Sequence, residues 1–262
     1  MNLKLKEVLL KYDIPITENN VSRLCEFAGL MLDYNQTHNL TAITEKDDII
    51  YKHLLDSLLP LDHLKDNTHI LDIGCGAGFP SVPLAISNVN LNISAIDSVR
   101  KKTDFIALVK DKLNINNINV MHTRIEDIAG NSSYRENFDI VTSRAVAPLN
   151  IILEYSAPML KNGGYIFAYK GANYQEEIDN ATNALKVLDC KVEEIYEYPI
   201  SEINATRYIL KIRKNSDIPI KYPRKQNKPR LQPLWNTKAV IQNNTKNKQQ
   251  TKYFIRGKLW EK

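Results

Sequence analysis

The sequence predicts an α/β protein with a mostly parallel sheet, an N-terminal helical cap and a basic C-terminal tail. Three observations predict this class. Apolar residues recur at helical spacing over residues 1–66, short apolar runs alternate with amphipathic segments over residues 67–214, and periodicity ends after about residue 215. Strands that alternate with helices favour a parallel sheet with helices on both faces.

The expected elements follow in order along the chain. We expect strands at 69–75, 92–98, 117–124, 138–145 and 163–171, with helices beginning near Phe79 and spanning 99–114, 148–161 and 173–188. Two last strands, 191–200 and 205–214, are joined too tightly for a parallel crossover, so one of them should run antiparallel. The tail, residues 215–262, is polar, proline-bearing and basic, and should be extended or disordered.

Composition limits where the protein works. The 262 residues, 43% of them hydrophobic, suffice for one sizeable α/β domain with appendages. No run approaches the roughly 18 to 20 apolar residues that span a bilayer, and the N-terminus lacks the features of a signal peptide. The three cysteines are far apart and form no CxxC pair. We therefore expect a reduced, cytoplasmic monomer that binds neither a membrane nor a metal.

Charge is distributed unevenly. Residues 211–262 contain 15 Lys and Arg against Asp217 and Glu261, whereas residues 1–210 contain 20 basic and 28 acidic residues. A basic tail on an acidic body suggests a polyanionic partner, most often nucleic acid. A solvated tail without a specific partner remains the alternative.

A glycine-rich turn follows the first predicted strand in ILDIGCGAGFP, residues 70–80. Glycine allows positive φ and lets a ligand approach the backbone, so Gly74, Gly76 and Gly78 between a strand and a helix indicate a nucleotide-binding turn. The dinucleotide fingerprint would need glycine at position 79, where this chain has Phe79, which disfavours a nicotinamide-dependent oxidoreductase.

Two carboxylates refine the ligand. Asp72 precedes the turn and suits a ligand with a cationic amino group, and Asp97 ends the second strand, where it can accept both ribose hydroxyls. S-adenosylmethionine has both groups and an adenine. In this architecture TRIEDI (123–128) lies beside the adenine, where Ile125 can pack on the ring and the Glu126 backbone or carboxylate can read its edge. The alternatives are that both aspartates cap turns and that TRIEDI is an acidic helix start.

Several motifs in the right order resemble one family, the bacterial small-subunit ribosomal RNA guanine-N7 methyltransferases, also called glucose-inhibited division protein B. The resemblance covers about residues 20 to 226, and its motifs are HNLTAI (38–43), KHLLDSL (52–58), LDIGCGAGFPSVPLAI (71–86), DSVRKK (97–102), VTSRAVAPL (141–149), AYKG (168–171) and KYPRK (221–225). It implies a Rossmann-like, class I S-adenosylmethionine-dependent fold with a mostly parallel seven-stranded sheet.

The resemblance also implies an activity and its residues. The family methylates N7 of a guanine in the decoding-region hairpin of 16S rRNA, so 16S rRNA or the small ribosomal subunit is the expected partner. It implies cofactor contacts at Gly74, Phe79, Ile125, Glu126 and Arg144. Arg144 and Lys170 end predicted strands and are our candidates for catalysis and phosphate contact. Their alternatives are a salt bridge of Arg144 to Asp139 or Glu126 and a solvated strand end at Lys170.

Basic residues outside the turn are candidates for RNA contact. They are Arg100 and Lys101 at a helix start, where they oppose the helix dipole, and Lys221, Arg224 and Lys225 in the tail. Simple surface charge is the alternative for the first pair. Competing functions are a methyltransferase for tRNA or a small molecule, and a non-catalytic rRNA-binding assembly factor. His38 and His53 are expected to pack in the cap rather than to bind a metal.

Overall fold

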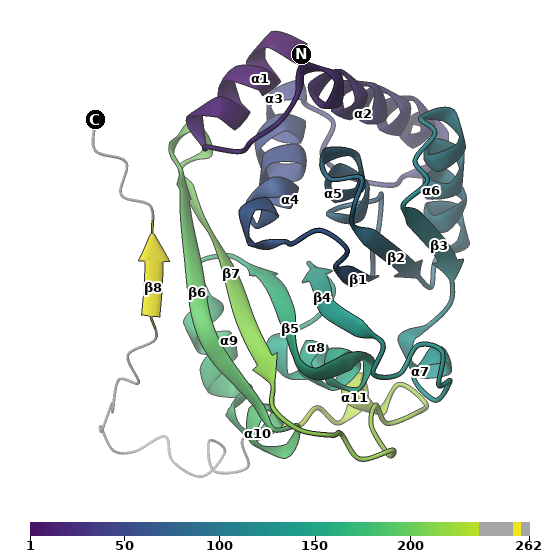
Figure 1. Ribbon diagram of the computed structural model, residues 1–262, viewed down its shortest axis with the longest axis vertical. Coiled ribbons are helices and arrows are strands. Elements are labelled where there is room, and N and C mark those ends of the chain that lie inside the picture. Colours follow the sequence, from purple (N-terminus) through teal and green to yellow (C-terminus); the bar gives the residue numbers. More distant parts are fainter. Residues whose placement is uncertain (236–253, 258–262) are drawn as a thin grey trace. The chain divides into compact units, whose positions relative to one another are not determined.

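The computed structural model describes residues 1–235 and 254–257 (Figure 1). The chain divides into two compact units, Met1–Arg124 and Ile125–Lys262. Among the described residues, no helix is long and apolar enough to cross a membrane.

The first unit begins with helices only. They are α1 (Asn2–Lys11), α2 (Glu18–His38), α3 (Lys46–Asp48), the π-helix η1 (Ile49–Leu55), α4 (Asp56–Leu58) and the 3-10 helix η2 (Leu61–His63). The Thr17 side chain caps α2 by accepting from the Asn20 backbone N–H, and Asn39 ends it in a left-handed conformation. These residues form the predicted helical region before the first strand.

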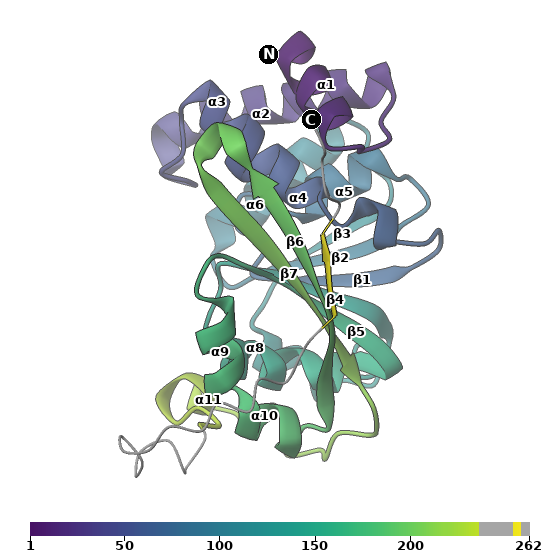
Figure 2. The same cartoon turned by 90° about the vertical axis from the view of Figure 1, so that its left-hand side faces the viewer.

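A parallel three-stranded array completes the first unit. Its elements are β1 (His69–Ile73), α5 (Ser81–Ser87), β2 (Asn92–Asp97), α6 (Arg100–Lys112) and β3 (Ile118–His122), and β2 lies between β1 and β3 with both pairings parallel. Helices α5 and α6 pack on these strands and α2 packs on both helices, as Figure 2 shows above β1 to β3. The strands β1 and β2 are short and largely buried, because helices cover them.

The second unit continues the α/β alternation. Its elements are α7 (Ile125–Ile128), β4 (Phe138–Arg144), α8 (Leu149–Ser156), η3 (Ala157–Met159), β5 (Leu160–Lys170), α9 (Tyr174–Asn180), α10 (Thr182–Val187), β6 (Cys190–Ile200), η4 (Ser201–Ile203), β7 (Ala205–Lys214), α11 (Lys228–Leu231) and β8 (Phe254–Gly257). Strand β4 pairs with β5 in parallel, whereas β7 lies antiparallel between β5 and β6. Strand β8 pairs with β6 in parallel.

The predicted fold class is confirmed. Seven strands precede residue 215, three in the first unit and four in the second, and only the pairings of β7 among them are antiparallel. The predicted helix at 173–188 is divided at Ala181 into α9 and α10. The π-helix η1 was not predicted, because its apolar spacing resembles that of an α-helix. The domain boundaries at 66/67 and 214/215 stay predictions.

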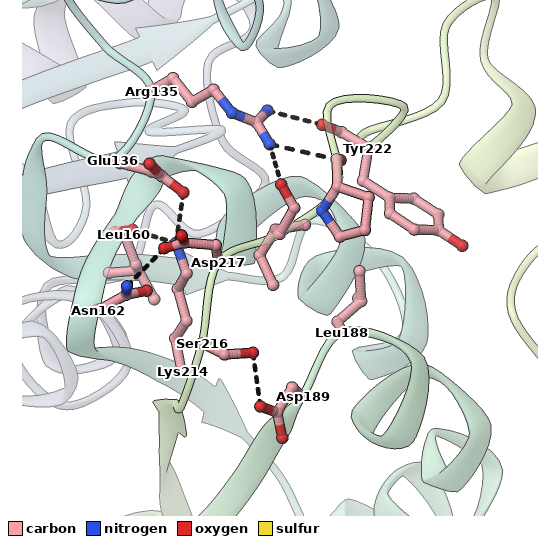
Figure 3. Close-up of polar contacts among 12 residues, drawn as sticks. Arg135, Glu136, Leu160, Asn162, Leu188, Asp189, Lys214, Ser216, Asp217 and Tyr222 are labelled. Atoms are coloured by element: carbon pink, nitrogen blue, oxygen red, sulfur yellow. Dashed lines mark hydrogen bonds and ion pairs between the residues drawn. The ribbon is translucent and has the colours of Figure 1, made fainter.

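The start of the predicted tail is attached to the second unit. The guanidinium of Arg135 donates to the carbonyls of Ile218 and Tyr222 at 2.6 and 2.9 Å, inside a bend of the segment (Figure 3). Asn162 donates to Asp217, and Ser216 donates to Asp189. For residues 215–235, which we call the C-terminal segment, these bonds replace the expected extended or disordered structure. Residues 236–253 and 258–262 lie outside the described residues.

A buried lysine closes the core of the second unit at the end of β7. The Lys214 side chain is fully buried, and its Nζ donates to the Leu160 carbonyl at 2.7 Å and to Glu136 Oε1 at 3.1 Å (Figure 3). A buried ammonium group is tolerated only when such partners replace its water. Lys214 therefore ties the end of β7 to β5 immediately before the C-terminal segment begins.

Lys214→Met should lower the free energy of unfolding by about 1 to 3 kcal/mol, because the Leu160 carbonyl loses this buried donor. Urea denaturation would measure the change. Lys161→Met is the matched control, since Lys161 pairs with Asp139 at 2.7 Å but both side chains are exposed, and an exposed pair contributes about 0 to 1 kcal/mol. Equal losses in the two variants would contradict a special role for Lys214.

Candidate cofactor site

The glycine-rich turn of the first unit is held by the end of the neighbouring strand. Gly74, Gly76 and Gly78 have φ values of 71°, 57° and 92°, in the left-handed region that other residues rarely adopt. The backbone N–H groups of Gly74 and Cys75 both donate to the Ile96 carbonyl, at 2.9 and 3.0 Å. The sequence therefore places glycine where the chain must turn away from β1 directly beside β2.

Asp97 connects the turn with the next helix. Its Oδ2 accepts from the Gly76 backbone N–H at 3.0 Å, and its Oδ1 accepts from the Val99 N–H at 2.9 Å. Lys102 Nζ lies 3.7 Å from Oδ2, and the aspartate is only 7% exposed. Asp97 therefore does cap the adjacent turns, as the alternative interpretation expected. A carboxylate has about four acceptor sites, so these contacts are compatible with additional bonds to a ligand.

Two glycines of the turn have different physical roles. A Cβ on Gly78 would lie 2.8 Å from Val82 Cγ2 and 3.4 Å from Phe27 Cζ, so Gly78 permits close packing of the turn on α5 and α2. A Cβ on Gly76 would meet nothing closer than the Gly74 carbonyl oxygen at 3.9 Å. The space next to Gly76 is open, as a backbone that receives a ligand requires.

The remaining polar groups of the turn are buried. Asp72 in β1 is 1% exposed and Cys75 is 1% exposed. Burial raises the pKa of the Cys75 thiol well above its usual value, and the negative charges of Asp72 and Asp97 raise that pKa further. Cys75 therefore stays protonated at neutral pH and acts as a small turn residue rather than a nucleophile.

The two cap motifs are in contact with each other, and one of them contacts Phe79. Thr41 of HNLTAI and His53 of KHLLDSL are joined by a hydrogen bond of 3.1 Å between Oγ1 and Nε2. The His53 ring is buried and stacks on the Phe79 ring, with centroids 4.3 Å apart and planes 10° from parallel. The packing expected for His53 is confirmed, but its link to Phe79 was missed because the sequence gives no distance between the motifs.

His38 lies elsewhere in the cap. Its ring stacks on Tyr34 with centroids 3.9 Å apart, and its backbone carbonyl accepts from Lys101 Nζ at 2.5 Å. Lys101 thus makes an intramolecular contact, whereas Arg100 is exposed at the first turn of α6. In the part of the chain that the structure describes, no group of three or more His, Cys, Asp or Glu side chains is arranged to hold a metal ion.

The second unit contains the residues expected at the adenine. Ile125, which begins α7, is 5% exposed, and Glu126 is half-buried. The hydroxyl of Tyr155 in α8 donates to Glu126 Oε1 at 3.3 Å. Tyr155 was not among the predicted residues, because its position in an apolar helix suggested core packing alone.

Arg144 and Lys170 differ in their surroundings. Arg144 is the last residue of β4, is half-buried and precedes Ala145, whose φ is 55°. Asp139, one partner considered for Arg144, pairs with Lys161. The Lys170 side chain is only 9% exposed, and its Nζ contacts Glu177 Oε2 at 2.5 Å and the Ala147 carbonyl at 3.3 Å.

The surroundings of Lys170 differ from the solvated strand end that was its alternative, because its side chain is paired and largely buried. Glu177 Oε2 also accepts from the Leu149 backbone N–H at 2.9 Å, at the start of α8. Lys170 therefore links β5, α9 and the chain that follows Arg144, and its predicted role in catalysis stays a prediction. Its neutralised ammonium group is a poor phosphate ligand because Glu177 would have to be displaced.

Arg224 also has a structural role. Its backbone N–H and Nε donate to Glu154 Oε1 at 2.9 and 2.8 Å, and its Nη2 donates to Glu154 Oε2 at 2.6 Å. Glu154 is completely buried, and its hydrogen bond raises the pKa of Arg224. The guanidinium is thus bonded within the protein, and the predicted contact of Arg224 with RNA stays a prediction that would have to compete with Glu154. Lys221 and Lys225 are exposed.

Comparison with known proteins identifies the family. The family model described as rRNA small subunit methyltransferase G, GidB, matches residues 20–204. The chain belongs to this family. A protein named "Ribosomal RNA small subunit methyltransferase G" from a Thermoanaerobacter species is 42% identical over 217 residues, covering 82% of this chain and 90% of the relative. A protein of the same name from Alkaliphilus oremlandii is 39% identical over 238 residues, covering 89% of this chain and all of the relative.

Solved structures support the fold independently. M. jannaschii TYW2 in complex with AdoMet has a TM-score of 0.52 at 15% identity and covers 66% of this chain and 79% of its own. A predicted O-methyltransferase from Agrobacterium tumefaciens has a TM-score of 0.50 at 18% identity, covering 62% of this chain and 80% of its own. At such identities the likeness concerns the fold alone.

Gly78→Ala should destabilise the first unit more than Gly76→Ala. Both changes force alanine to a positive φ, at a cost of about 1 kcal/mol, but only the Gly78 methyl meets Val82, which adds about 1 to 3 kcal/mol of overpacking. Thermal and urea unfolding would measure both effects. The double variant Gly78→Ala with Val82→Ala should recover part of the difference, whereas equal stability of the single variants would refute the packing role.

Proposed function

We propose that this protein methylates N7 of a specific guanine in the decoding-region hairpin of 16S rRNA and uses S-adenosylmethionine as the methyl donor. Membership of the rRNA small subunit methyltransferase G family carries this proposal. The substrate is 16S rRNA or the small ribosomal subunit, and the protein acts in the cytoplasm as a monomer.

The cofactor would be held in part by the turn described above. The open space at Gly76 and the positive φ values of Gly74 and Gly76 fit a ligand that approaches the backbone. Asp97, at the end of β2, suits the ribose hydroxyls, and Asp72 suits the amino group. Phe79, supported by His53, orders the turn next to them. Gly78 is assigned to packing within this turn.

The other proposed cofactor residues rest on the family resemblance. They are Ile125, Glu126 and Arg144, in the second unit. The buried side chain of Ile125 suits an apolar ring, and the carboxylate of Glu126 is suited to an amino group. Arg144 remains our candidate for contact with the cofactor, a phosphate or guanine O6.

The reaction makes light chemical demands on the protein. Bound S-adenosylmethionine supplies a methyl group whose carbon is attacked by the N7 lone pair as the sulfur–methyl bond breaks and its electrons return to sulfur. Guanine N7 carries no proton, so no general base is required. The protein must instead align the two reactants and exclude other geometries, which is catalysis by proximity and orientation. The absence of a nucleophile–base pair from the predicted motifs agrees with this requirement.

Exposed cations are proposed to bind the RNA backbone. Arg100 and Lys101 belong to the first unit, and Lys221 and Lys225 to the C-terminal segment. Lys101 can exchange its exposed contact with the His38 carbonyl for a phosphate at small cost. Phosphate contacts set affinity and its salt dependence rather than base specificity.

Labelled S-adenosylmethionine tests the reaction directly. Incubated with small subunits that lack the modification, the protein should transfer label to one position recovered as 7-methylguanosine after nuclease digestion.

The Gly74→Asp variant should bind the cofactor at least about tenfold more weakly, because the new side chain blocks the turn and adds a negative charge. Calorimetry on the folded variant would measure this loss. Cofactor binding without transfer would point to another acceptor, with tRNA tested next, and no binding by the natural protein would refute the cofactor assignment.

The pair Lys221→Ala and Lys225→Ala should weaken RNA binding and lower the slope of log affinity against log salt by about 1 to 2, because each lost phosphate contact contributes about 0.7 to 0.9. Filter binding over a salt series would measure the slope. Lys186→Ala with Lys191→Ala is the matched control, since both lysines are exposed on the second unit and outside the proposed surface. An equal slope in both pairs would exclude the C-terminal segment from RNA contact.

A further inference from the structure

The C-terminal segment reaches the residues expected at the adenine. Within the second unit, Glu126 lies in α7, Tyr155 lies in α8, and Arg230 lies in α11 of the C-terminal segment. Helix α11 packs against α8, and the chain returns there after β7 (Figure 1). Residues separated by about a hundred positions in the sequence are therefore connected by direct contacts.

Tyr155 lies between the other two residues. The Arg230 guanidinium is close enough to the Tyr155 hydroxyl to lower its pKa in part, and that hydroxyl donates to Glu126 Oε1 at 3.3 Å. A phenol can accept from a guanidinium and donate to a carboxylate at the same time. In this arrangement the guanidinium can act as a donor, the phenol as both acceptor and donor, and the carboxylate as an acceptor.

Burial keeps the Tyr155 hydroxyl protonated, so that it acts as a donor. Tyr155 is 3% exposed. Burial raises the pKa of Tyr155 and the Glu126 charge raises it further, while Arg230 lowers it in part. The hydroxyl therefore keeps its proton at neutral pH and donates to Glu126. Because the Tyr155 ring is buried, this charge-assisted bond orients the carboxylate more strongly than a bond at the open surface would.

The segment that carries Arg230 is attached to α8 through one buried carboxylate. Arg224 is bound to the fully buried carboxylate of Glu154, the neighbour of Tyr155 in α8, and its Nη2 also donates to the Gln232 carbonyl at 2.8 Å. Arg230 thus lies between two residues, Arg224 and Gln232, that are hydrogen-bonded to each other. Arg230 Nη2 also approaches the Val146 carbonyl at 3.4 Å, two residues after Arg144.

We propose that Tyr155 and Arg230 are positioning residues that orient the Glu126 carboxylate toward the adenine amino group of the cofactor. This inference rests on the proposed function, because it requires that Glu126 reads the adenine. It makes the C-terminal segment part of the cofactor-binding apparatus as well as a carrier of RNA-binding cations. Truncation after residue 214 should accordingly weaken cofactor binding as well as RNA binding.

Two ligands separate positioning from general stabilisation. S-adenosylhomocysteine carries the adenine amino group, and S-inosylhomocysteine carries an oxygen in its place. Calorimetry on the full-length protein should show that Tyr155→Phe weakens binding of the adenosine ligand about fivefold, the size expected for one hydrogen bond, and changes binding of the inosine ligand less than twofold. Tyr134→Phe, which removes a hydroxyl from a half-buried tyrosine outside α8, should change neither.

Variants of Arg230 extend the test without altering the core, since Arg230 is exposed. Arg230→Met should reproduce the selective loss, and Arg230→Lys, which keeps a donor, should restore part of it. With Glu126→Gln as background, Tyr155→Phe should have less than a twofold further effect, because the two residues act as one unit.

Three outcomes are distinguishable. Equal weakening of both ligands in Tyr155→Phe or Arg230→Met would overturn the positioning role, as would full additivity with Glu126→Gln. Normal binding of the adenosine ligand by both variants would also overturn it while leaving the proposed function intact. Failure of the natural protein to bind either ligand would instead refute the cofactor assignment on which the inference rests.

Discussion

The glycine turn depends on one interaction, the acceptance of its backbone N–H groups by the end of β2. The Ile96 carbonyl binds Gly74 and Cys75, and Asp97 binds Gly76. A backbone at positive φ has few internal partners of its own, so its polar groups must be satisfied by a neighbour. The end of β2 provides these partners and thereby fixes the shape of the turn before any ligand is present. Phe79 is held from the other direction by His53, whose partner Thr41 belongs to the preceding motif.

Ion pairs with one largely buried member organise the second unit in a comparable way. Glu154 with Arg224 and Lys214 with Glu136 connect elements that are distant in sequence, and Lys170 with Glu177 connects β5 to α9. Such pairs add little net stability because desolvation opposes the attraction, but an unpaired member would be costly, so each pair excludes alternative arrangements. The first two pairs attach the end of β7 and the C-terminal segment to the rest of the unit. Helix α11 of that segment packs against α8, the helix that contains Tyr155.

Charge alone does not distinguish basic residues that are bonded inside the protein from exposed basic residues that are proposed to contact RNA. Arg224 and Lys225 are neighbours in the sequence and have the same formal charge, yet the first is committed to Glu154 and the second is exposed. Lys170 and Lys221 differ in the same manner. A cation that already has a buried partner gains little from a phosphate, whereas an exposed cation keeps most of its hydration at the surface while counterions are released from the RNA. The proposed RNA contacts therefore follow exposure and not the density of basic residues.

The sequence by itself determined the α/β class, most strand and helix positions, and the location of the glycine-rich turn. These follow from local periodicity and from glycine, whose backbone preferences need no distant partner. It also gave the family, through motifs in a particular order. Only the tertiary structure decided that Gly78 serves packing, that His53 supports Phe79, and that Arg224 and Lys170 are internal. The contact between Tyr155 and Glu126 was likewise visible only in the tertiary structure. Each of these roles depends on which distant side chains fold into contact, and no local pattern encodes that distance.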